Sequence, residues 1–346
     1  MRRSRKPIVI AARSSPLARV QARLVGGGLS RLHPAIEVKF HWIESQGDRI
    51  TDRALAGEGG KGMFTSEVDR AVLDGRADVG VHSFKDVPVT PTPGLALAAI
   101  PKRADVRDCL IASDPAVQRI EDLPEAAVVG TSSPRRAAQL RALRSDLSIR
   151  LLRGNVGTRL KKVLGDPHDP RRDPLTGSPQ QPPMYDATLL SVAGLTRLKL
   201  HQHAQRPIDV ETILPAASQG AMALFCRADD HVTLTRCLPL NNAETSTAVH
   251  AERRLVEQLE ADCGSAIAAL AEPVAPPHGQ PVRNSEAHWF RFRARVMAYD
   301  GSRMLEADET VQTRELTRML DRVASDMIRA GAKELLRADA DIPTLS

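Results

Sequence analysis

Ala127-Val-Val-Gly130-Thr-Ser-Ser133-Pro-Arg-Arg136 joins a short apolar run to a hydroxyl-rich turn and then to a helical pattern. The run Ala127–Gly130 predicts a buried strand. Ser132 and Ser133 are typical helix-capping residues, and Pro134 suits the first helical position, where its missing N–H would have no partner anyway. A strand that runs directly into a helix is the unit of parallel α/β sheets. This stretch therefore predicts an α/β fold.

The same alternation of short apolar runs and helical patterns continues through the first two-thirds of the chain. We predict helices over Pro16–Leu24 and Ser66–Leu73. The first pattern is expected to break at Gly26-Gly-Gly28, because each glycine inside a helix costs about 1 kcal/mol relative to alanine. The predicted strands are Ile8–Ala12, Val38–Ile43, Val79–Ser83, Leu95–Ile100, Cys109–Ala112, Ala127–Gly130, Ile149–Leu152, Thr188–Val192 and Ala221–Cys226.

The C-terminal part of the chain has a different pattern. Residues Phe290–Ala298 alternate apolar side chains with three arginines, which predicts a half-exposed strand. Tyr299-Asp-Gly301 supplies a hairpin turn, and the apolar residues of Leu316–Leu335 share one helix face. These features predict a small, separate α+β domain.

The length of the chain, 346 residues, exceeds the size at which one hydrophobic core usually stops growing. We therefore expect two or three domains. Between the regions of regular pattern, Asp166–Met184 is rich in proline and polar residues and has almost no large apolar side chains. It predicts a long, flexible surface loop, because ordering it would cost entropy with little burial in return.

The net charge of +6 favours an anionic partner. Nucleic acid is one candidate, but aromatic residues make up only 3% of the chain, too few for base-stacking platforms. A small polyanion bound in a cleft fits better. No apolar run reaches the roughly 20 residues of a membrane span, and Pro7–Ala12 is too short for a signal peptide. We expect a cytoplasmic protein with no membrane partner.

The four cysteines are scattered, with no C-x-x-C pair. This spacing favours neither a zinc site nor a disulfide framework. His201 and His203 are too isolated to indicate a metal, so none is expected. Three cysteines are expected in cores as small apolar residues.

Two strand ends carry candidate binding residues. After Val79–Ser83, the turn Ser83-Phe-Lys-Asp86 places Lys85 and Asp86 where open α/β sheets bind ligands. The lysine would bind an anion and the aspartate would stabilise a developing cation. The alternative interpretation is an exposed ion pair without function.

The second strand end is Gly130-Thr-Ser-Ser-Pro-Arg-Arg136. The free N–H groups and the dipole of a helix N-terminus bind anions, and Arg135 and Arg136 would strengthen that binding. The alternative is a capped helix with a solvated basic face. Arg153-Gly-Asn155 follows the next strand and adds another cation near the same edge. By contrast, Gly57–Gly62 lacks the glycine spacing and the Ser or Thr of a phosphate loop.

Seven stretches, in order along the chain, resemble motifs of the porphobilinogen deaminase (hydroxymethylbilane synthase) family. One such motif would be weak, but the ordered set is specific and covers about residues 8 to 270. The stretches are Arg13-Ser-Ser15-Pro-Leu-Ala, Gly59-Gly-Lys-Gly-Met-Phe64, His82-Ser-Phe-Lys-Asp-Val-Pro88, Gly130-Thr-Ser-Ser-Pro-Arg-Arg136, Arg153-Gly-Asn155, Tyr185-Asp-Ala187 with Ala193-Gly-Leu-Thr-Arg197, and Leu214-Pro-Ala-Ala-Ser-Gln-Gly-Ala221.

The resemblance implies two doubly wound α/β domains similar to the halves of a periplasmic binding protein, plus a small C-terminal α+β domain. Domain 1 would comprise residues 1–101 and 221–240. Domain 2 would comprise residues 102–220, with the proline-rich insertion 166–184. Domain 3 would comprise residues 241–346 and carry the cofactor.

The cofactor implied by the resemblance is a dipyrromethane, bound through a thioether to the position of Cys263. The family usually has Gly-Gly before this cysteine and C-x-x-P-I from it onward. This chain has Ala261-Asp262 before it and Ala266-Ile267 after it. Without the resemblance, a buried structural cysteine would be the preferred interpretation.

The resemblance implies condensation of four porphobilinogen molecules, with loss of ammonia, to the linear tetrapyrrole hydroxymethylbilane in haem biosynthesis. Asp86 would stabilise the cationic pyrrole nitrogens and assist proton transfer. Arginine suits the substrate carboxylates because its fork pairs both oxygens. The expected carboxylate binders are Arg13, Lys85, Arg135, Arg136, Arg153 and Arg197, with hydrogen bonds from Ser15, Ser83, Thr131, Ser132, Ser133 and Asn155.

Two other functions remain open at this point. A cytoplasmic anion-binding or sensor module on the same two-lobed fold would need the cleft but neither Asp86 nor Cys263 as chemical groups. Nucleic-acid binding through the basic face would show a steep dependence on salt. We expect a monomeric transferase that takes porphobilinogen as its substrate.

Overall fold

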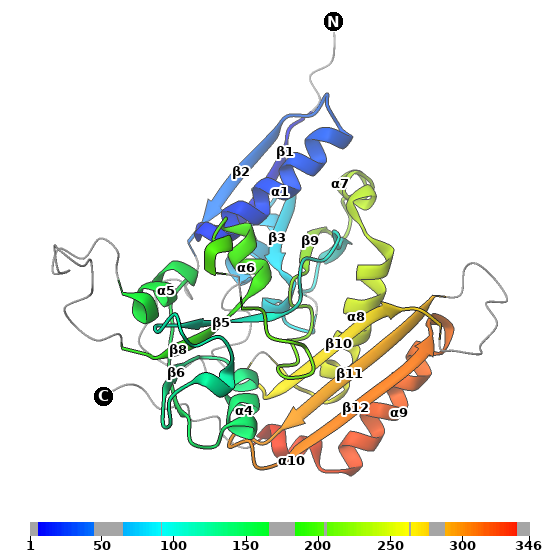
Figure 1. Cartoon of the computed structure of the whole chain (residues 1–346). Coiled ribbons are helices and arrows are strands. Elements are labelled where there is room, and N and C mark those ends of the chain that lie inside the picture. The colour runs from blue at the N-terminus through cyan, green and yellow to red at the C-terminus, as the bar shows by residue number, and fades with distance from the viewer. Residues whose placement is uncertain are drawn as a thin grey trace, which may run out of the picture.

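The computed structural model describes residues 6–44, 65–90, 92–165, 184–203, 206–262, 264–276 and 288–337. Within these residues the chain builds three β-sheets with helices packed against them (Figure 1). The structure is thus mixed α/β, as the alternating pattern predicts. The glycine-rich stretch 57–62, residues 166–183 of the predicted loop and Cys263 lie outside the described residues.

The first sheet has five strands in the order β2-β1-β3-β9-β4. Strands β2, β1 and β3 are parallel, whereas β9 returns from much later in the chain and runs antiparallel to both β3 and β4. Its elements are β1 (Ile8–Arg13), α1 (Pro16–Leu32), β2 (Val38–Ile43), α3 (Ser66–Leu73), β3 (Val79–Ser83), η2 (Phe84–Asp86), β4 (Leu95–Ala99), β9 (Met222–Arg227), α7 (His231–Cys237) and η5 (Leu238–Leu240).

The second sheet has four strands in the order β5-β8-β6-β7. Strands β8, β6 and β7 are parallel, and β5 is antiparallel to β8. Its elements are β5 (Asp108–Ala112), η3 (Ile120–Asp122), β6 (Val128–Gly130), α4 (Pro134–Leu143), β7 (Ser148–Arg150), α5 (Val156–Leu164), β8 (Ala187–Ser191), α6 (Val192–Arg197) and η4 (His201–His203).

The third sheet is antiparallel, in the order β10-β11-β12. Its elements are α8 (Ala243–Gln258), β10 (Ile267–Val274), β11 (Trp289–Met297), β12 (Met304–Gln312), η6 (Thr313–Glu315), α9 (Leu316–Arg329) and α10 (Ala332–Arg337). The prediction of a half-exposed strand at β11 holds for Arg291 and Arg295, which are half-buried, but is wrong for Arg293, which is only 7% exposed. Arg293 is covered by ion pairs with Glu211, before the return crossing, and with Glu272 of β10.

All nine strands predicted for the first two-thirds of the chain occur, each within two residues of its predicted ends. The predicted break of α1 at its glycines is wrong, since the helix continues to Leu32. Close packing explains why glycine stands there: a Cβ at Gly26 would lie 2.8 Å from Phe40 Cζ, and one at Gly28 would lie 2.8 Å from Leu240 Cδ2. The glycines allow α1 to pack closely against β2 and η5, and this packing stabilises the helix despite the glycines within it.

Two segments cross between the first and second sheets. The outgoing segment leaves β4 and reaches β5, and the returning segment enters β9. They meet where Ala104 N–H donates to Gly220 O at 3.2 Å. Gly220 has φ +85°, and a Cβ there would lie 2.6 Å from Ala104 O, so the crossing requires glycine.

Three cysteines were expected in cores, and this prediction is confirmed: Cys109, Cys226 and Cys237 are free and fully buried. None of the helices in the described part of the chain combines the length and apolarity needed to cross a bilayer. Among the same residues, no group of three or more metal-binding side chains comes together.

Candidate active site

The turn η2 follows β3 and presents Lys85 and Asp86 at the carboxyl end of the strand. Phe84 anchors the turn from below: it is 3% exposed and packs edge-on against Phe225, with ring centroids 6.4 Å apart. Val87 N–H donates to Phe84 O at 3.2 Å and closes the turn. Both predicted residues therefore lie at the edge of the sheet where α/β folds bind ligands.

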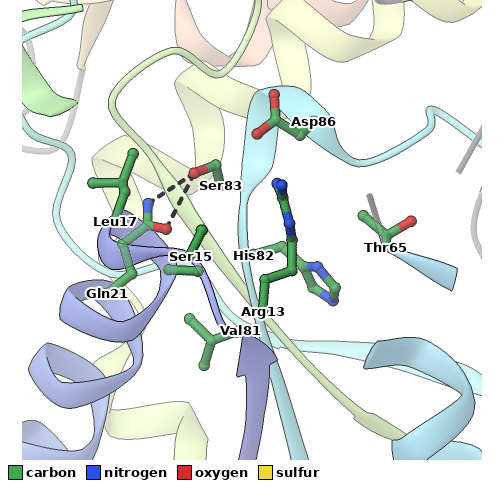
Figure 2. A pocket seen from close by; sticks show the side chains of 10 residues that line it. Arg13, Ser15, Leu17, Gln21, Thr65, Val81, His82, Ser83 and Asp86 are labelled. Carbon is green, nitrogen blue, oxygen red and sulfur yellow. Dashed lines mark hydrogen bonds between the residues drawn. The ribbon is translucent and has the colours of Figure 1, made fainter. Parts of the chain in front are cut away.

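A cavity of about 60 Å³ lies beside this turn (Figure 2). Arg13 ends β1, and in Figure 2 its guanidinium points toward Asp86. Ser15 takes the N-cap position of α1, and within the described part of the chain its side chain makes no capping hydrogen bond. The polar lining residues are Arg13, Ser15, Gln21, Thr65, His82, Ser83 and Asp86.

Ser83 is held by Gln21, a buried residue of α1 that the sequence did not single out. Gln21 Nε2 donates to Ser83 Oγ at 2.8 Å, and Ser83 Oγ is 3.2 Å from Gln21 Oε1. Gln21 is only 2% exposed. The pair fixes the Ser83 hydroxyl in the cavity wall.

His82, on the opposite face of β3 from Ser83, packs against α3. Its Nε2 lies 3.0 Å from Asp69 Oδ1, and Thr92 Oγ1 donates to Asp69 Oδ2 at 2.8 Å. Both partners are at least nine-tenths buried. The pair ties α3 to the strand that carries the candidate catalytic turn.

Lys85 donates from Nζ to Gln219 Oε1 at 3.1 Å. Burial and the nearby Arg136 lower the pKa of Lys85 to about 8, although Asp86 and Asp108 favour its charged form. Gln219 Nε2 in turn donates to Val106 O and Asp108 Oδ1, both at 2.8 Å. A single amide on the returning segment thus joins the candidate catalytic turn to the second sheet.

Arg135 and Arg136, predicted to bind substrate carboxylates, both pair with the buried carboxylate of Asp108. Arg135 Nη2 lies 2.8 Å from Asp108 Oδ2, and Arg136 Nη2 lies 2.7 Å from Oδ1. Burial opposes ionisation of Asp108, but the two arginines outweigh it and hold its pKa well below the usual range. Burial also lowers the pKa of Arg135, which donates to Leu214 O at 2.7 Å as well. The three groups form one buried cluster with a net positive charge.

The turn Thr131–Ser133 lies beside this cluster, at the start of α4. Thr131 is 1% exposed, and its hydroxyl accepts from Ser133 N–H at 3.1 Å. Ser133 is the N-cap of α4, and in the described structure its side chain makes no capping bond. Ser132 Oγ accepts from Arg159 Nη2 at 3.3 Å.

Arg159, in α5, is a site residue that sequence reasoning missed. Its Nε donates to Gly154 O at 2.9 Å, and among the described residues no carboxylate accepts from it. Burial lowers its pKa to about 10, with Arg136 and Arg153 acting in the same direction and Asp86 opposing them. Arg159 follows the motif Arg153-Gly-Asn155 closely in the chain. Its position just after the motif is the signal by which the sequence could have identified it.

Arg153 and Asn155 have different positions. Arg153 is half-buried after β7, close enough to Arg159 to influence its pKa. Asn155 is exposed and caps α5 by accepting from Thr158 N–H at 2.9 Å. Its side chain therefore has a structural partner already.

Arg197 ends α6, and its Nη2 donates to Gly220 O at 2.6 Å. Burial lowers its pKa to about 10. The guanidinium is thus attached to the returning segment, next to Gln219.

Residues on both sides of Cys263 form a compact turn. Asp262 Oδ1 accepts from Gly264 N–H at 2.9 Å and from Ser265 Oγ at 3.1 Å, and Tyr299 Oη donates to Gly264 O at 2.6 Å. Asp262, which departs from the family motif, therefore has a structural role in this turn.

A second cavity, of about 480 Å³, lies at the crossing segments and contains none of the predicted site residues. Several of its charges are paired with each other or with neighbours: Arg103 with Glu252, and Arg107 with Asp105. Asp86 lies near Lys85 and Arg159, neither of which donates to a carboxylate among the described residues, so this cluster is the candidate active site.

Comparison with known protein families identifies one model, described as "Porphobilinogen deaminase, dipyromethane cofactor binding domain". It matches residues 8–235. This range includes the cavity, the η2 turn, Asp108 and every arginine of the cluster.

Among solved structures, the chain is similar to a full-length BenM variant, with 12% identity, 69% of this chain and 66% of that chain covered, and a TM-score of 0.39. It is also similar to a TRAP periplasmic solute binding protein from Desulfovibrio salexigens (9% identity, 69% and 73% covered, TM-score 0.38). The OxyR2 regulatory domain from Vibrio vulnificus is a third (11% identity, 69% and 99% covered, TM-score 0.36). At these scores the likenesses identify neither fold nor function.

Proposed function

The chain belongs to the porphobilinogen deaminase family, and from this premise we propose that it is a hydroxymethylbilane synthase. It would condense four porphobilinogen molecules head to tail, releasing one ammonia in each condensation, and would act in haem biosynthesis. The observation that carries the proposal is the position of Asp86. Asp86, at the end of β3, lies close enough to Arg159 of α5 to raise the pKa of that guanidinium, so the same site would hold a cation stabiliser and an anion receptor.

The cations suit a substrate that carries acetate and propionate groups. Arg159 and Lys85 are half-buried, and among the described residues neither donates to a carboxylate. A partly desolvated charge without a counter-ion is costly, so binding a substrate carboxylate relieves part of that cost. Arg13 in the cavity wall and Arg153 beside Arg159 would extend the receptor.

The buried cluster of Asp108 with Arg135 and Arg136 would act differently. Since both guanidiniums already bind Asp108, their contribution to substrate binding would come mainly from the net positive charge of the cluster and from orienting the neighbouring residues. The positive charge of Arg136 lowers the pKa of both Lys85 and Arg159. We propose this indirect role beside the direct one expected from the motif.

The donor set fits a dipyrromethane cofactor, because that group also carries several carboxylates. Cys263 would hold it through a thioether, and Lys85, Arg153 and Arg159 would bind its acidic side chains. When bound, the cofactor supplies the free pyrrole carbon to which the first substrate is joined.

The residues of this chain have separate parts in the proposed reaction. Asp86 would accept a hydrogen bond from a pyrrole N–H and stabilise the positive charge that develops as the C–N bond to ammonia breaks. A carboxylate already in place does this without reorganising solvent. Ser83, fixed by Gln21, would orient the substrate beside Asp86, and Arg13 would bind one of its carboxylates.

We also propose that the three sheets correspond to three domains, with residues 1–101 and 221–240, 102–220, and 241–346. The first two would be lobes of the periplasmic-binding type, closing on the substrate at the crossing segments.

The test uses the purified full-length chain. Its intact mass should exceed the sequence mass by one dipyrromethane, and it should consume porphobilinogen with release of ammonia. Acid oxidation of the product should give a porphyrin, detected by absorbance. An anion-binding sensor would bind porphobilinogen without consuming it, and that result would refute the proposal.

A further inference from the structure

Arg253, in α8, is a half-buried cation that the proposed reaction does not use. Its guanidinium lies 4.3 Å from the ring centroid of Phe84. It donates to the carbonyl oxygens of Phe84 at 3.3 Å, Val87 at 3.0 Å and Pro88 at 2.5 Å. These carbonyls stand on both sides of Lys85–Asp86, so one side chain holds both ends of the catalytic turn.

The charge of Arg253 is maintained despite its burial. Burial lowers its pKa to about 10, and Glu257 acts in the opposite direction, so the guanidinium stays ionised at neutral pH. Charge-assisted hydrogen bonds are stronger than neutral ones. Three of them, together with stacking on Phe84, need the planar fork of arginine, which lysine lacks.

The neighbouring residue on α8 binds the other parts of the cleft framework. Glu252 is fully buried and accepts from Arg103 Nη1 at 2.6 Å, Ser218 N–H at 2.6 Å and Ala271 N–H at 2.9 Å. These contacts reach the outgoing segment, the returning segment and β10. Through Glu252 and Arg253, α8 therefore binds both crossing segments and the catalytic turn.

Figure 1 shows α8 between the first sheet and the three-stranded sheet. The helix packs on β10 and α9. It ends at Gln258, a few residues before Cys263 in the chain. The turn that carries Asp86 is thus attached to the same helix that leads to the position of the attachment cysteine.

We propose that Arg253 is a positioning residue, which fixes the Lys85–Asp86 turn relative to α8 and thereby sets the turnover rate. The inference rests on the proposed function. In this role Arg253 would act through the position at which it holds Asp86, and not through contact with substrate or cofactor. Preorganised groups lose their effect when they shift by about 1 Å, which typically costs ~10²-fold in rate.

The first arm of the test compares Arg253→Met and Arg253→Lys with the parent holoenzyme. Methionine keeps contact with Phe84 but has no donors, whereas lysine keeps the charge without the fork. For both variants we expect kcat to fall by about 10- to 100-fold with KM within about threefold of the parent. Arg254→Met is the matched control, because Arg254 is the next residue of the helix and pairs with Asp321 instead. It should keep kcat within about twofold of the parent.

The second arm separates positioning from general destabilisation. In an Asp86→Asn background, Arg253→Met should reduce turnover by no more than about threefold further, because it acts through a carboxylate already removed. Amide hydrogen exchange of residues 84–87 should rise in Arg253→Met and Arg253→Lys and stay at the parent value in Arg254→Met.

Several results would overturn the inference: kcat in both Arg253 variants close to that of the parent, an effect on KM alone, full additivity with Asp86→Asn, or unchanged exchange in the turn. The exchange arm needs no turnover. A parent enzyme that fails to consume porphobilinogen would therefore refute the proposed function, while the exchange data still decide whether Arg253 holds the turn.

Discussion

Replacement of Asp108 by asparagine tests whether Arg135 and Arg136 are primarily structural. Asp108 is fully buried and accepts from Arg135 at 2.8 Å, from Arg136 at 2.7 and 3.1 Å, and from Gln219 at 2.8 Å. Asparagine keeps the size of the side chain but removes its charge. Its amide NH2 must also face at least one guanidinium donor. Two guanidiniums, 3% and 5% exposed, would then be buried without a counter-ion.

Breaking a buried ion pair by removing one partner typically costs about 3–5 kcal/mol. Asp108 serves two arginines and is completely inaccessible to solvent, so we expect Asp108→Asn to destabilise the protein by an amount in this range. At about 2–4 °C per kcal/mol for a domain of this size, the melting temperature should fall by roughly 6–20 °C.

The pH dependence of the effect has a definite sign. The folded-state pKa of Asp108 is depressed by its arginines, so its stabilisation is present above the unfolded pKa of about 3.9. It is lost as pH falls through the lower, folded-state pKa. The stability difference between parent and Asp108→Asn should therefore be constant near neutral pH and shrink below about pH 4.

The assay is thermal and urea unfolding of the two proteins between neutral and acidic pH. Asp146→Asn is the control: Asp146 pairs with Arg144 in the same part of the chain, but at a solvent-exposed position. It should melt close to the parent. A melting temperature for Asp108→Asn within about 2 °C of the parent would refute the reasoning, because it would mean that the two arginines do not depend on Asp108.

Four further outcomes follow from the site. Asp86→Asn should bind porphobilinogen but lose ~10²–10³ in turnover in steady-state assays; a loss of less than about tenfold would remove Asp86 from the mechanism. Because the pKa of Lys85 is about 8, kcat/KM of the parent should decline above that pH as the ammonium loses its proton, and Lys85→Arg should move this decline to higher pH; an identical pH profile would contradict it. Cys263→Ser should lack both the cofactor mass and activity, because a serine hydroxyl is a poor nucleophile; peptide mapping of an adduct on another cysteine would contradict the assignment. Asp262→Gly should speed cofactor attachment to apoprotein, because an adjacent carboxylate disfavours the thiolate; a slower rate by intact mass would mean that its bonds to Gly264 and Ser265 matter more.

The fold could be predicted where local pattern and tertiary packing agree. Short runs such as Val79–Ser83 favour a buried strand, and this strand occurs as expected. The continuation of α1 through its glycines could not be predicted, because helix propensity disfavours glycine. Their benefit depends on Phe40 and Leu240, which lie elsewhere in the chain. The same applies to Arg293, whose burial depends on Glu211 across the interface with the second sheet.

The candidate site could be predicted as far as residue type and strand-end position determine it. Arg135 and Arg159 show the limit. Both arginines lie near the candidate site, yet buried Arg135 has a buried carboxylate partner and half-buried Arg159 has none among the described residues. The partner, Asp108, lies 27 positions away from Arg135 on strand β5, so no local motif contains it. A motif selects arginines by their position in the chain, whereas substrate binding depends on which of them lacks an internal counter-ion. On that criterion Arg159, rather than Arg135, is the stronger candidate for direct contact with a substrate carboxylate.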